Sequence, residues 1–537
     1  MPSIGAADAA ASVPSRRHLI QLFDPALLLI LVLGLLLRLQ YLELPMAEAH
    51  RWREITNADV ARNFYERSMN IFRPQVNWGG AVAPYVGMEF PLMHWMVASL
   101  YWIVGEEAIV GRLVSMAFSV ATLWAIYLLG TWLFGKETGR AAAFLMAVSP
   151  SAVFFGRFFI SDTPMLFFSV AAVLAWVVYL DTRSTAACVA GSVCAGLAFL
   201  VKIPAIMILA PIAWAAWEAK RWAALKDRGL MLGLTAAVAA AGLWYWYADI
   251  VFHRTGLSES IWHPSGSYAP PISSAAGPFL RISHWATPTL LRDPNFYQQI
   301  IVTRSWVLHL TPAGFILGLF SLLALWRRPR RRILDVWLGV VLLFIVVAAN
   351  GNRHHEFHQL PILPPAALLA ALAAAPAFDG AWLRANGGRV FGVLGSAATL
   401  LVVALLSFKY SGVTQNFFRP DRLDMAPIRA GRSIESVVEP SALLVTVEYD
   451  EYGNNSPILL YWAHRRGWSF DGASITPNVI ELLRKDYGAR YFVTTIWGAL
   501  SAKQPELVGY LRTRREVRLP GNPRDTVLFD LATAASH

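Results

Sequence analysis

The stretch FGRFFISDTPMLFFSVAAVLAWVVYLDTRS (155–184) contains the pattern that decides the fold of this chain. An apolar run from residue 164 to residue 180 lies between an Arg and an Asp on one side and the polar segment DTRS on the other. An uncharged run of about 17–25 residues is long enough to cross the hydrocarbon core of a bilayer as a helix. We therefore expect residues 164–180 to span a membrane.

Similar apolar runs recur along most of the 537 residues, of which 56% are hydrophobic and 15% are charged. A soluble protein carries about 25% charged residues. The composition therefore predicts a polytopic α-helical membrane protein with about eleven transmembrane helices. The predicted spans are 21–43, 110–134, 141–156, 164–180, 187–201, 204–217, 230–251, 312–326, 334–349, 361–377 and 390–408. The first run is too long for a signal-peptide core and has no cleavage pattern, so we interpret it as a retained helix.

Basic residues gather in the short loops between the apolar runs, and such an excess marks cytoplasmic loops. The loops are Arg16-Arg17, KETGR (136–140), DTRS (181–184), EAKRWAALKDR (218–228), RRPRRR (327–332) and RANGGR (384–389). All of them follow an even number of crossings if the N-terminus is inside. This placement accounts for the net charge of +11, so we expect no nucleic-acid partner. We expect a multi-pass protein of the cytoplasmic (inner) membrane.

The same topology places residues 44–109 outside, as the first extracytoplasmic loop. Within it, FPLMHWMVASLYWIVG (90–105) is apolar but too short to span comfortably. We interpret this segment as an interfacial helix, with Trp95, Tyr101 and Trp102 at the level of the headgroups.

The composition changes at residue 411. The segments 442–448, 490–495 and 525–531 are typical of strands, and TPNVIELLRKDYG (476–488) has the cap, the first-turn proline and the final glycine of a helix. We therefore divide the chain into a transmembrane domain (1–410) and a small extracytoplasmic α/β domain (411–537).

Charged residues that the topology does not require gather at the outer ends of the predicted spans. They are Arg53, Glu54, Asp59, Glu89, Arg157, Asp162, Lys202, Arg353, His354, His355 and His358. Each has a structural interpretation as well: Asp162 as a helix cap, Lys202 as a side chain that reaches the interface, Asp59 as a partner of Arg62. Their number favours a site outside the membrane, where carboxylates act as a base and cations hold a phosphate.

An activated donor outside the cytoplasmic membrane must be carried by the membrane, because nucleotide sugars are absent there. A sugar on a polyprenyl phosphate meets this requirement. The spacing of the histidines matches no metal motif, and both cysteines, Cys188 and Cys194, lie in one apolar segment. The sequence therefore indicates no metal site and no cofactor, and leaves the use of a divalent metal ion open.

The chain also resembles the polyprenyl-phosphate-dependent glycosyltransferases of the C-type membrane fold. This group includes dolichyl-phosphate-mannose protein mannosyltransferases and bacterial aminoarabinose lipid A transferases. The resemblance covers residues 20–410 and depends on ARNFYE, EFPLMHWMVASLYWIVG followed by GRLVS, SPSAVFFGRFFISDTPMLFF, GLAFLVK and HQLPILPPAALL, in this order. It implies a polyprenyl-phosphate-sugar donor, a lipid, glycan or protein acceptor, and a donor site in the outer loops.

By this resemblance Asp162 matches the family's acid on the second outer loop, and Lys202 matches the basic residue that contacts the lipid-linked phosphate. Arg157 lies beside Asp162. A polar group near the donor in that family is matched by Arg353, together with His354, His355 and His358. The first loop departs from the pattern, because Thr56 occupies an expected Asp position.

Three residues are the candidate catalytic groups. Glu54 is the preferred base, Asp59 is a second first-loop acid, and Asp162 orients the acceptor or the cations. Arg53 and Glu89 join the candidate substrate-binding residues, and Glu89 or Asp162 is the base if neither first-loop acid serves. The predicted reaction is a single inverting displacement at the anomeric carbon. The alternatives are a transporter or lipid flippase, and a non-catalytic member of the same fold.

Overall fold

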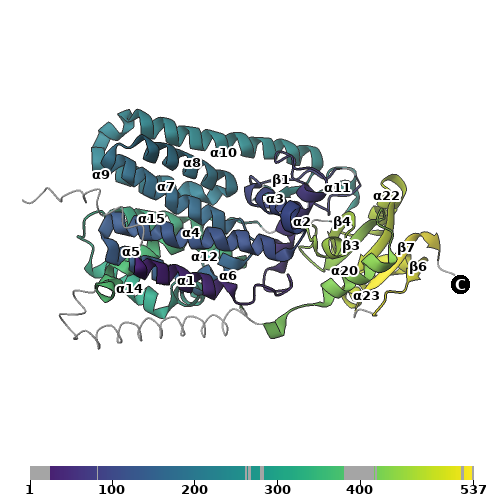
Figure 1. Ribbon diagram of the computed structural model, residues 1–537. Coiled ribbons are helices and arrows are strands. Elements are labelled where there is room, and N and C mark those ends of the chain that lie inside the picture. Colours follow the sequence, from purple (N-terminus) through teal and green to yellow (C-terminus); the bar gives the residue numbers. More distant parts are fainter. Residues whose placement is uncertain are drawn as a thin grey trace, which may run out of the picture.

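Long apolar helices dominate the described part of residues 25–378 in the computed structural model, and a five-stranded sheet with its helices follows near the C terminus (Figure 1). The structure describes residues 24–81, 83–260, 263, 268–277, 283–379, 417, 420–521 and 525–534. The main helices of the bundle are α1 (Pro25–Leu39), α4 (Ala108–Phe134), α5 (Lys136–Ala147), α6 (Pro150–Arg157), α7 (Asp162–Thr182), α8 (Thr185–Val201), α9 (Leu209–Lys220), α10 (Arg228–Thr255), α14 (Thr311–Ala324), α15 (Arg332–Val347) and α17 (Leu363–Ala374).

Shorter elements connect these helices. They are η2 (Ile203–Ile208), η3 (Arg221–Lys226), α11 (Ile272–Ala275), α12 (Pro288–Leu291), α13 (Pro294–Tyr297), the π-helix η4 (Gln298–His309), α16 (Ala349–His354), η5 (Glu356–Ile362) and η6 (Ala375–Phe378). The first loop contributes α2 (Arg51–Glu66), β1 (Gly87–Met88) and α3 (Leu92–Val104), and β1 pairs with β2 (Ser258–Glu259) in parallel.

Five of the described helices are long and apolar enough to cross a membrane, and seven if each of two bent pairs counts as one span. The predicted span 141–156 is one of these pairs, with α5 and α6 bent by 65°, and α14 is bent by 108° from the preceding segment 294–309. Helices α1, α8 and α15 correspond to predicted spans but have only 15, 17 and 16 residues. The predicted span 390–408 lies outside the described residues. A multi-pass helical membrane protein is confirmed, whereas the number of eleven spans stays a prediction.

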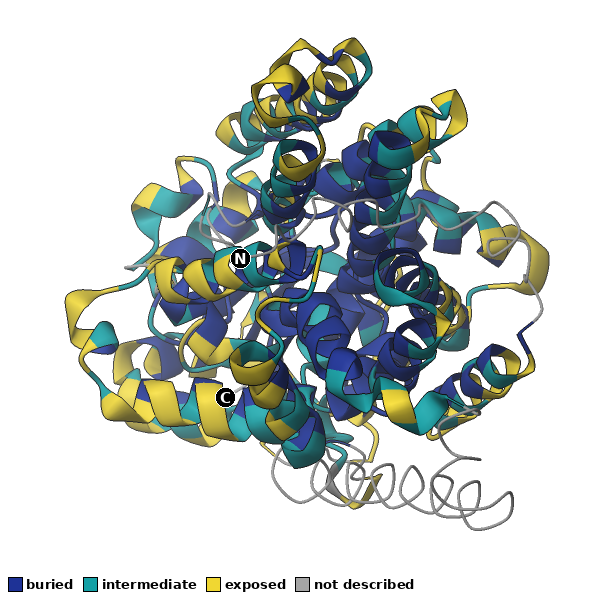
Figure 2. Cartoon of the chain, turned by 90° about the vertical axis from the view of Figure 1, so that its left-hand side faces the viewer, coloured by how far each residue is buried: buried dark blue, intermediate teal, exposed yellow. Residues whose placement is uncertain are grey.

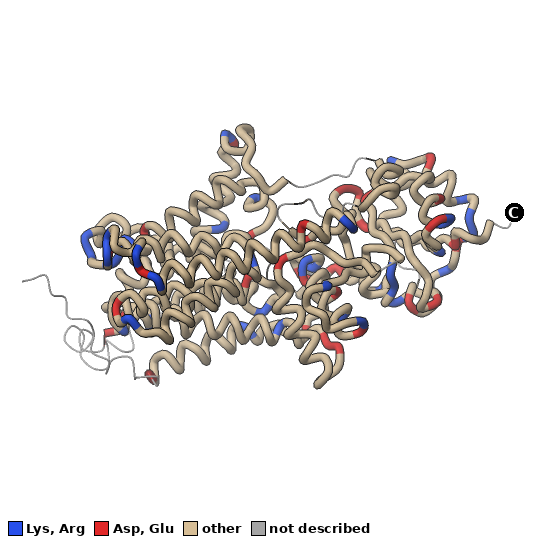
Figure 3. The backbone as a smooth tube through the Cα atoms, turned by 90° about the horizontal axis from the view of Figure 1, so that it is seen from above, with Lys and Arg blue, Asp and Glu red and all other residues tan. Residues whose placement is uncertain are grey.

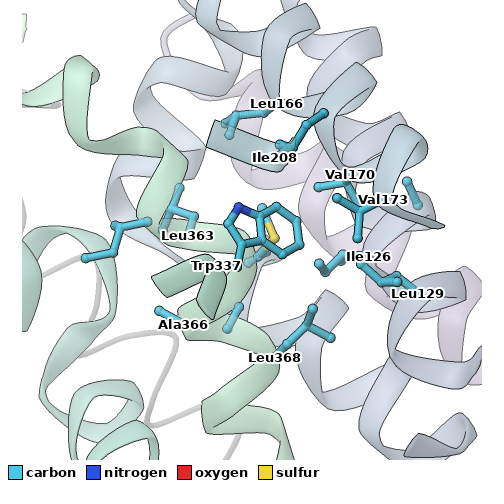
Figure 4. Close-up of a cluster of buried hydrophobic side chains, with 14 of the residues drawn as sticks. Ile126, Leu129, Leu166, Val170, Val173, Ile208, Trp337, Leu363, Ala366 and Leu368 are labelled. Atoms are coloured by element: carbon cyan, nitrogen blue, oxygen red, sulfur yellow. The ribbon is translucent and has the colours of Figure 1, made fainter. Parts of the chain in front are cut away.

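The interior of the bundle consists of apolar side chains on helices that are far apart in the sequence (Figure 4). Trp337 of α15 lies among Leu166 of α7, Ile208 of η2 and Leu363 of α17. Lipid tails are as apolar as these side chains, so tight van der Waals packing holds such helices together. Figure 2 shows the result along the bundle: buried residues face inward, and exposed residues cover the outer helices.

The basic loops lie together at one end of the bundle. Asp181 pairs with Arg330 at 2.7 Å, which joins the DTRS and RRPRRR loops, and Asp227 pairs with Lys220 at 2.5 Å and with Arg183. Figure 3 shows Lys and Arg gathered at this end, away from the C terminus. Trp132, four residues before KETGR, also donates to Asp181 at 2.7 Å. Four of the loops that the parity argument placed on one side therefore lie at one end of the molecule.

Helix α3 exposes only part of the face that the sequence assigned to the headgroups. Trp102 and Ile103 are 67% and 77% exposed, and Trp95 is half-buried. Tyr101 is buried instead, in edge-to-face contact with Tyr65 of α2, so its predicted place at the headgroups is wrong.

The five-stranded sheet has the order β4-β3-β5-β7-β6, with β3 parallel to β4 and β5, and β7 antiparallel to β5 and β6. The described elements of this C-terminal segment are η7 (Pro420–Arg422), α20 (Ala426–Val437), β3 (Leu443–Tyr449), α21 (Ile458–Trp462), β4 (Arg466–Asp471), α22 (Pro477–Asp486), β5 (Ala489–Thr494), α23 (Trp497–Lys503), α24 (Pro505–Arg512), β6 (Arg514–Val517) and β7 (Val527–Ala534). Strands β3, β5 and β7 coincide with the three segments whose pattern is typical of strands.

The first loop covers the β4 edge of this sheet. The Gly467 amide donates to the Asn77 carbonyl at 3.0 Å, and the Gly80 amide donates to the Gly467 carbonyl at 2.7 Å. An exposed edge of this kind pairs readily with other chains, so covering it protects the monomer from aggregation. The same pairing joins residues 77–80 to the C-terminal segment, and Trp78 and Trp468 are buried in one apolar cluster.

The orientation of the bundle is testable by cysteine labelling, after Cys188 and Cys194 are replaced by Ala. Ala502 in α23 and Pro329 in the RRPRRR loop are both exposed and lie at opposite ends of the molecule. Because Lys- and Arg-rich loops stay in the cytoplasm, an impermeant maleimide added to sealed right-side-out vesicles should label Ala502→Cys and spare Pro329→Cys. The opposite labelling would contradict the proposed orientation.

Candidate active site

Four charged side chains form a buried network where α2 meets α4 and α6. Arg112 of α4 donates from Nε and Nη2 to the two carboxylate oxygens of Glu54, at 2.7 and 2.8 Å. Arg157 of α6 binds both oxygens of Glu48, at 2.9 and 2.7 Å, and Arg112 also reaches Glu48 at 3.4 Å. All four side chains are at most 8% exposed. The two acids neutralise the two cations, which is the condition under which buried charges are tolerated.

This network assigns a structural role to two residues that the sequence offered as catalytic or phosphate-binding. Both oxygens of Glu54 bind Arg112, so an acceptor hydroxyl would have to displace this bidentate pair to reach the carboxylate. Arg157 is fully buried and gives two of its N–H donors to Glu48, which compensates its charge. The geometry therefore favours Glu54 as the residue that holds α2 against α4.

Asp59, the second first-loop acid, is completely buried on α2. Its Oδ2 accepts the Asn77 amide at 2.7 Å, and its Oδ1 has no hydrogen-bond partner among the described residues. Arg62 does not pair with it as the sequence spacing suggested, but binds Glu106 at 2.6 Å and the Tyr461 carbonyl at 2.7 Å. Burial raises the pKa of Asp59 to about 7, because the nearby hydrogen bond and arginines offset only part of the desolvation.

Lys202 and Asp162 form a second centre, at the end of the bundle opposite to the basic loops. Lys202 lies at the break between α8 and η2, and its Nζ contacts Asp162 Oδ2 at 2.5 Å. Asp162 begins α7, next to its N-cap Ser161. An ammonium has three donors, so this pair leaves Lys202 two further hydrogen bonds for a phosphate. The structure thus brings together two of the residues that the sequence selected.

Arg53 approaches the same centre from α2. Its Nη1 pairs with Glu259 Oε2 at 3.1 Å, and Asn455 donates to the other oxygen of Glu259 at 3.1 Å. Its guanidinium also lies over the Trp52 ring, 4.4 Å from the centroid. Asn455 comes from the segment between β3 and α21, so a residue of the C-terminal segment helps to hold the arginine in place.

Glu89 lies between the two pairs, just after β1. The charges of Lys202 and Arg53 attract its carboxylate, and those of Asp162 and Glu259 repel it. Among the described residues it has no hydrogen-bond or ion-pair partner, although it is only half-buried. Burial raises the pKa of Glu89 above its usual range, with the two cations opposing the shift. An unpaired carboxylate with a raised pKa is well suited to accept a proton near neutral pH.

The predicted histidine loop contributes only part of its residues to this centre. Phe357 lies under Lys202, 5.3 Å from Nζ to the ring centroid, and stacks against His355. The His355 and His358 rings are 5.3 Å apart, and burial keeps the pKa of His355 well below its usual range, so this imidazole is neutral. In contrast, Arg353 is exposed and lies 3.5 Å from Asp293, and His354 is exposed as well.

Several residues of the site were missed in the sequence. They are Glu48, Arg112, Glu259 and Asn455, which belong to the two ion networks. Arg112 carried a usable signal, because an arginine four residues inside an apolar helix needs an acid to neutralise it. Glu259 and Asn455 had none, since their partners are 206 and 196 residues away.

Replacing Glu54 tests its structural role. Glu54→Gln leaves the Arg112 guanidinium buried without a full counter-charge, so we expect a loss of about 3–5 kcal/mol in stability. The measurement is the thermal unfolding midpoint in detergent, with the exposed Glu66→Gln on the same helix as the control. A Glu54→Gln variant as stable as that control, and inactive, would return the role of base to Glu54.

The family model described as dolichyl-phosphate-mannose-protein mannosyltransferase matches residues 87–246, a region that includes Glu89, Arg157, Asp162 and Lys202. No curated protein sequence matches the chain.

Three solved structures show the similarity in fold. ArnT from Cupriavidus metallidurans, bound to undecaprenyl phosphate, aligns with a TM-score of 0.59 and 14% identity over 95% of this chain and 99% of its own. The oligosaccharyltransferase AglB from Archaeoglobus fulgidus, in complex with an inhibitory peptide and a dolichol-phosphate, aligns with a TM-score of 0.55 and 14% identity over 93% of this chain and 72% of its own.

The arabinofuranosyltransferase AftD from Mycobacteria aligns with a TM-score of 0.54 and 15% identity, over 95% of this chain and 40% of its own. The alignments with ArnT and AglB each cover more than nine tenths of this chain, so they include both the helical bundle and the C-terminal sheet. The chain therefore has the fold of the C-type membrane glycosyltransferases, and its resemblance to that group is confirmed.

Proposed function

We propose that this protein is an inverting glycosyltransferase that moves a sugar from a polyprenyl-phosphate donor to a lipid, glycan or protein acceptor of the cell envelope. The observation that carries the proposal is the carboxylate of Glu89, which pairs with no described residue and lies beside the Lys202–Asp162 pair. This arrangement supplies a base and a phosphate-binding cation at one end of a bundle with the C-type fold.

The donor phosphate would bind at Lys202, within reach of the two donors that Asp162 leaves open. Arg53 adds a second positive charge, which Glu259 and Asn455 hold in position. Asp162 orients the ammonium toward the phosphate. The buried ion pairs on α2 keep Arg53 aligned with this centre, because Glu54 lies next to it in the same helix.

Glu89 would accept the proton of the acceptor hydroxyl or amine while that group attacks the anomeric carbon. The new bond forms on the face opposite to the phosphate, and the electron pair of the breaking C–O bond leaves on the phosphate oxygen. The configuration inverts in one step. A phosphate needs no proton to leave, so one carboxylate suffices, unlike the two that glycoside hydrolysis requires.

The site would face the outside of the cytoplasmic membrane, since it lies at the end opposite to the basic loops. An isoprenoid tail would then lie in the bilayer while its phosphate reaches Lys202. The C-terminal segment stands at this same end, where Asn455 touches the network, so we infer that it takes part in acceptor recognition.

Replacing Glu89 separates proton transfer from folding. We expect Glu89→Gln to lower the rate of sugar transfer by about 10²–10⁴-fold, because the amide keeps the shape but accepts no proton. Its unfolding midpoint should stay close to that of the wild type, since Glu89 pairs with no described residue. The wild-type rate should rise with pH through the raised pKa of Glu89 and then level off. The measurement is transfer from a purified polyprenyl-phosphate sugar in matched detergent preparations.

Lys202→Gln provides the contrast within the same assay. It should weaken the binding of polyprenyl phosphate itself, whereas Glu89→Gln should leave that binding intact, because only the cation contacts the phosphate. The double variant Lys202→Gln/Asp162→Asn controls for the acid that the single change leaves unpaired. A fully active Glu89→Gln, or unchanged lipid binding by both Lys202 variants, would overturn these assignments.

A further inference from the structure

Two histidines and an aspartate converge at the end of α10, outside the catalytic centre. Asp249 and His253 are four residues apart on this helix and therefore share one face. His263, from the segment after the helix, places its Nε2 2.5 Å from Asp249 Oδ1, and His253 Nε2 lies 3.5 Å from Asp249 Oδ2. One ligand atom from each residue lies within 4.8 Å of the other two.

From this geometry we propose that Asp249, His253 and His263 bind a divalent transition-metal ion, with Zn²⁺ as the best fit. Imidazole nitrogen and carboxylate oxygen are ligands of Zn²⁺, and a tetrahedral ion with bonds of about 2.0–2.1 Å keeps its ligand atoms roughly 3.3 Å apart. The two imidazole nitrogens lie 2.5 and 3.5 Å from the carboxylate oxygens of Asp249, on either side of this spacing. His253 is 69% exposed, so solvent water completes the coordination sphere.

The site is partly preorganised. The His263 ring stacks on Phe252 with centroids 4.0 Å apart and planes at 16°, which fixes its orientation toward the helix. The His253 and His263 rings meet edge to face at 5.7 Å. Neutral imidazoles with a fixed ring plane bind a metal with less loss of entropy than free side chains do. Within the part of the chain that the structure describes, this is the one group of His, Cys, Asp and Glu side chains with such spacing.

A metal at this position would fasten the segment that supports Glu89. Strand β2, just after α10, pairs with β1, and the Gly87 amide donates to the Leu257 carbonyl at 3.0 Å. Gly87 lies so close to α10 that a Cβ there would come within 2.3 Å of the Ala248 carbonyl oxygen. The ion would join both ends of the α10–β2 turn, and so hold β1 and the following Glu89 against the helix.

Zinc titration of untagged, chelator-treated protein tests the proposal. We expect one Zn²⁺ per chain in the wild type, and an affinity at least about tenfold lower after Asp249→Asn, His253→Ala or His263→Ala, since each change removes one of three ligands. His464→Asn, at an exposed histidine of the C-terminal segment, is the matched control and should bind like the wild type. His253→Ala changes an exposed helix position, so it keeps the test valid if another variant folds poorly.

Hydrogen exchange gives a readout that requires no sugar transfer. Zn²⁺ should slow exchange in a peptide that contains Gly87 in the wild type and in His464→Asn, and should leave it unchanged in His253→Ala. Absence of stoichiometric binding would mean that the histidines only pair with Asp249 and would overturn the proposal. Binding that persists in all three cluster variants would place the metal elsewhere and overturn it as well.

Discussion

The bidentate pair between Glu54 and Arg112 is the interaction on which the geometry of the site depends. It joins α2 to α4 inside the protein, where neither charge is tolerated alone. With Glu48 and Arg157 it forms a neutral network that fixes the start of α2. Arg53, the neighbour of Glu54, is thereby directed toward Glu259 and the proposed active site. Glu54, which the sequence offered as a base, is thus bound to Arg112 and fixes the position of its neighbour Arg53.

The pairing of charges also separates the acids of the site by role. Glu54 and Glu48 are bound by arginines, Glu259 by Arg53 and Asn455, and Asp162 by Lys202. Glu89 has no such partner among the described residues. Its partly buried carboxylate is attracted by the charges of Lys202 and Arg53. Its proton affinity therefore depends on the occupancy of the site. A bound phosphate that draws on the charge of Lys202 would raise the pKa of Glu89 further, which couples donor binding to the strength of the base.

Much of the architecture could be predicted from the sequence, because it depends on local patterns. Apolar runs predicted helices α4, α7, α10 and α17. The charges of the loops predicted which loops lie together, and Thr476 and Pro477 indicated the start of α22. The bend between α5 and α6 was missed because both halves are equally apolar, although Pro150 follows the break. Tyr101 was placed at the headgroups because its contact with Tyr65 of α2 is not visible from spacing along α3.

The sequence predicted which residues gather at the site, but not how they pair. The sequence selected Lys202, Asp162, Arg53 and Glu89 as residues at one end, and the structure brings them together. It gave no means to find their partners, because Glu54 and Arg112 are 58 residues apart and Arg53 and Glu259 are 206 apart. Nearby residues were misleading instead: Asp59 and Arg62 share a helix face, yet Arg62 binds Glu106. Which acid is free depends on these long-range pairs.

The most direct test of this account is the rescue of a truncated carboxylate by formate. With Glu89→Ala, added formate should occupy the vacated space, accept the proton in place of the side chain and restore a measurable part of sugar transfer. With Glu54→Ala, formate should restore none, because the loss there is structural. Rescue of the Glu54 variant, or no rescue of a Glu89→Ala variant that still binds polyprenyl phosphate, would contradict the assignment of Glu89 as the base.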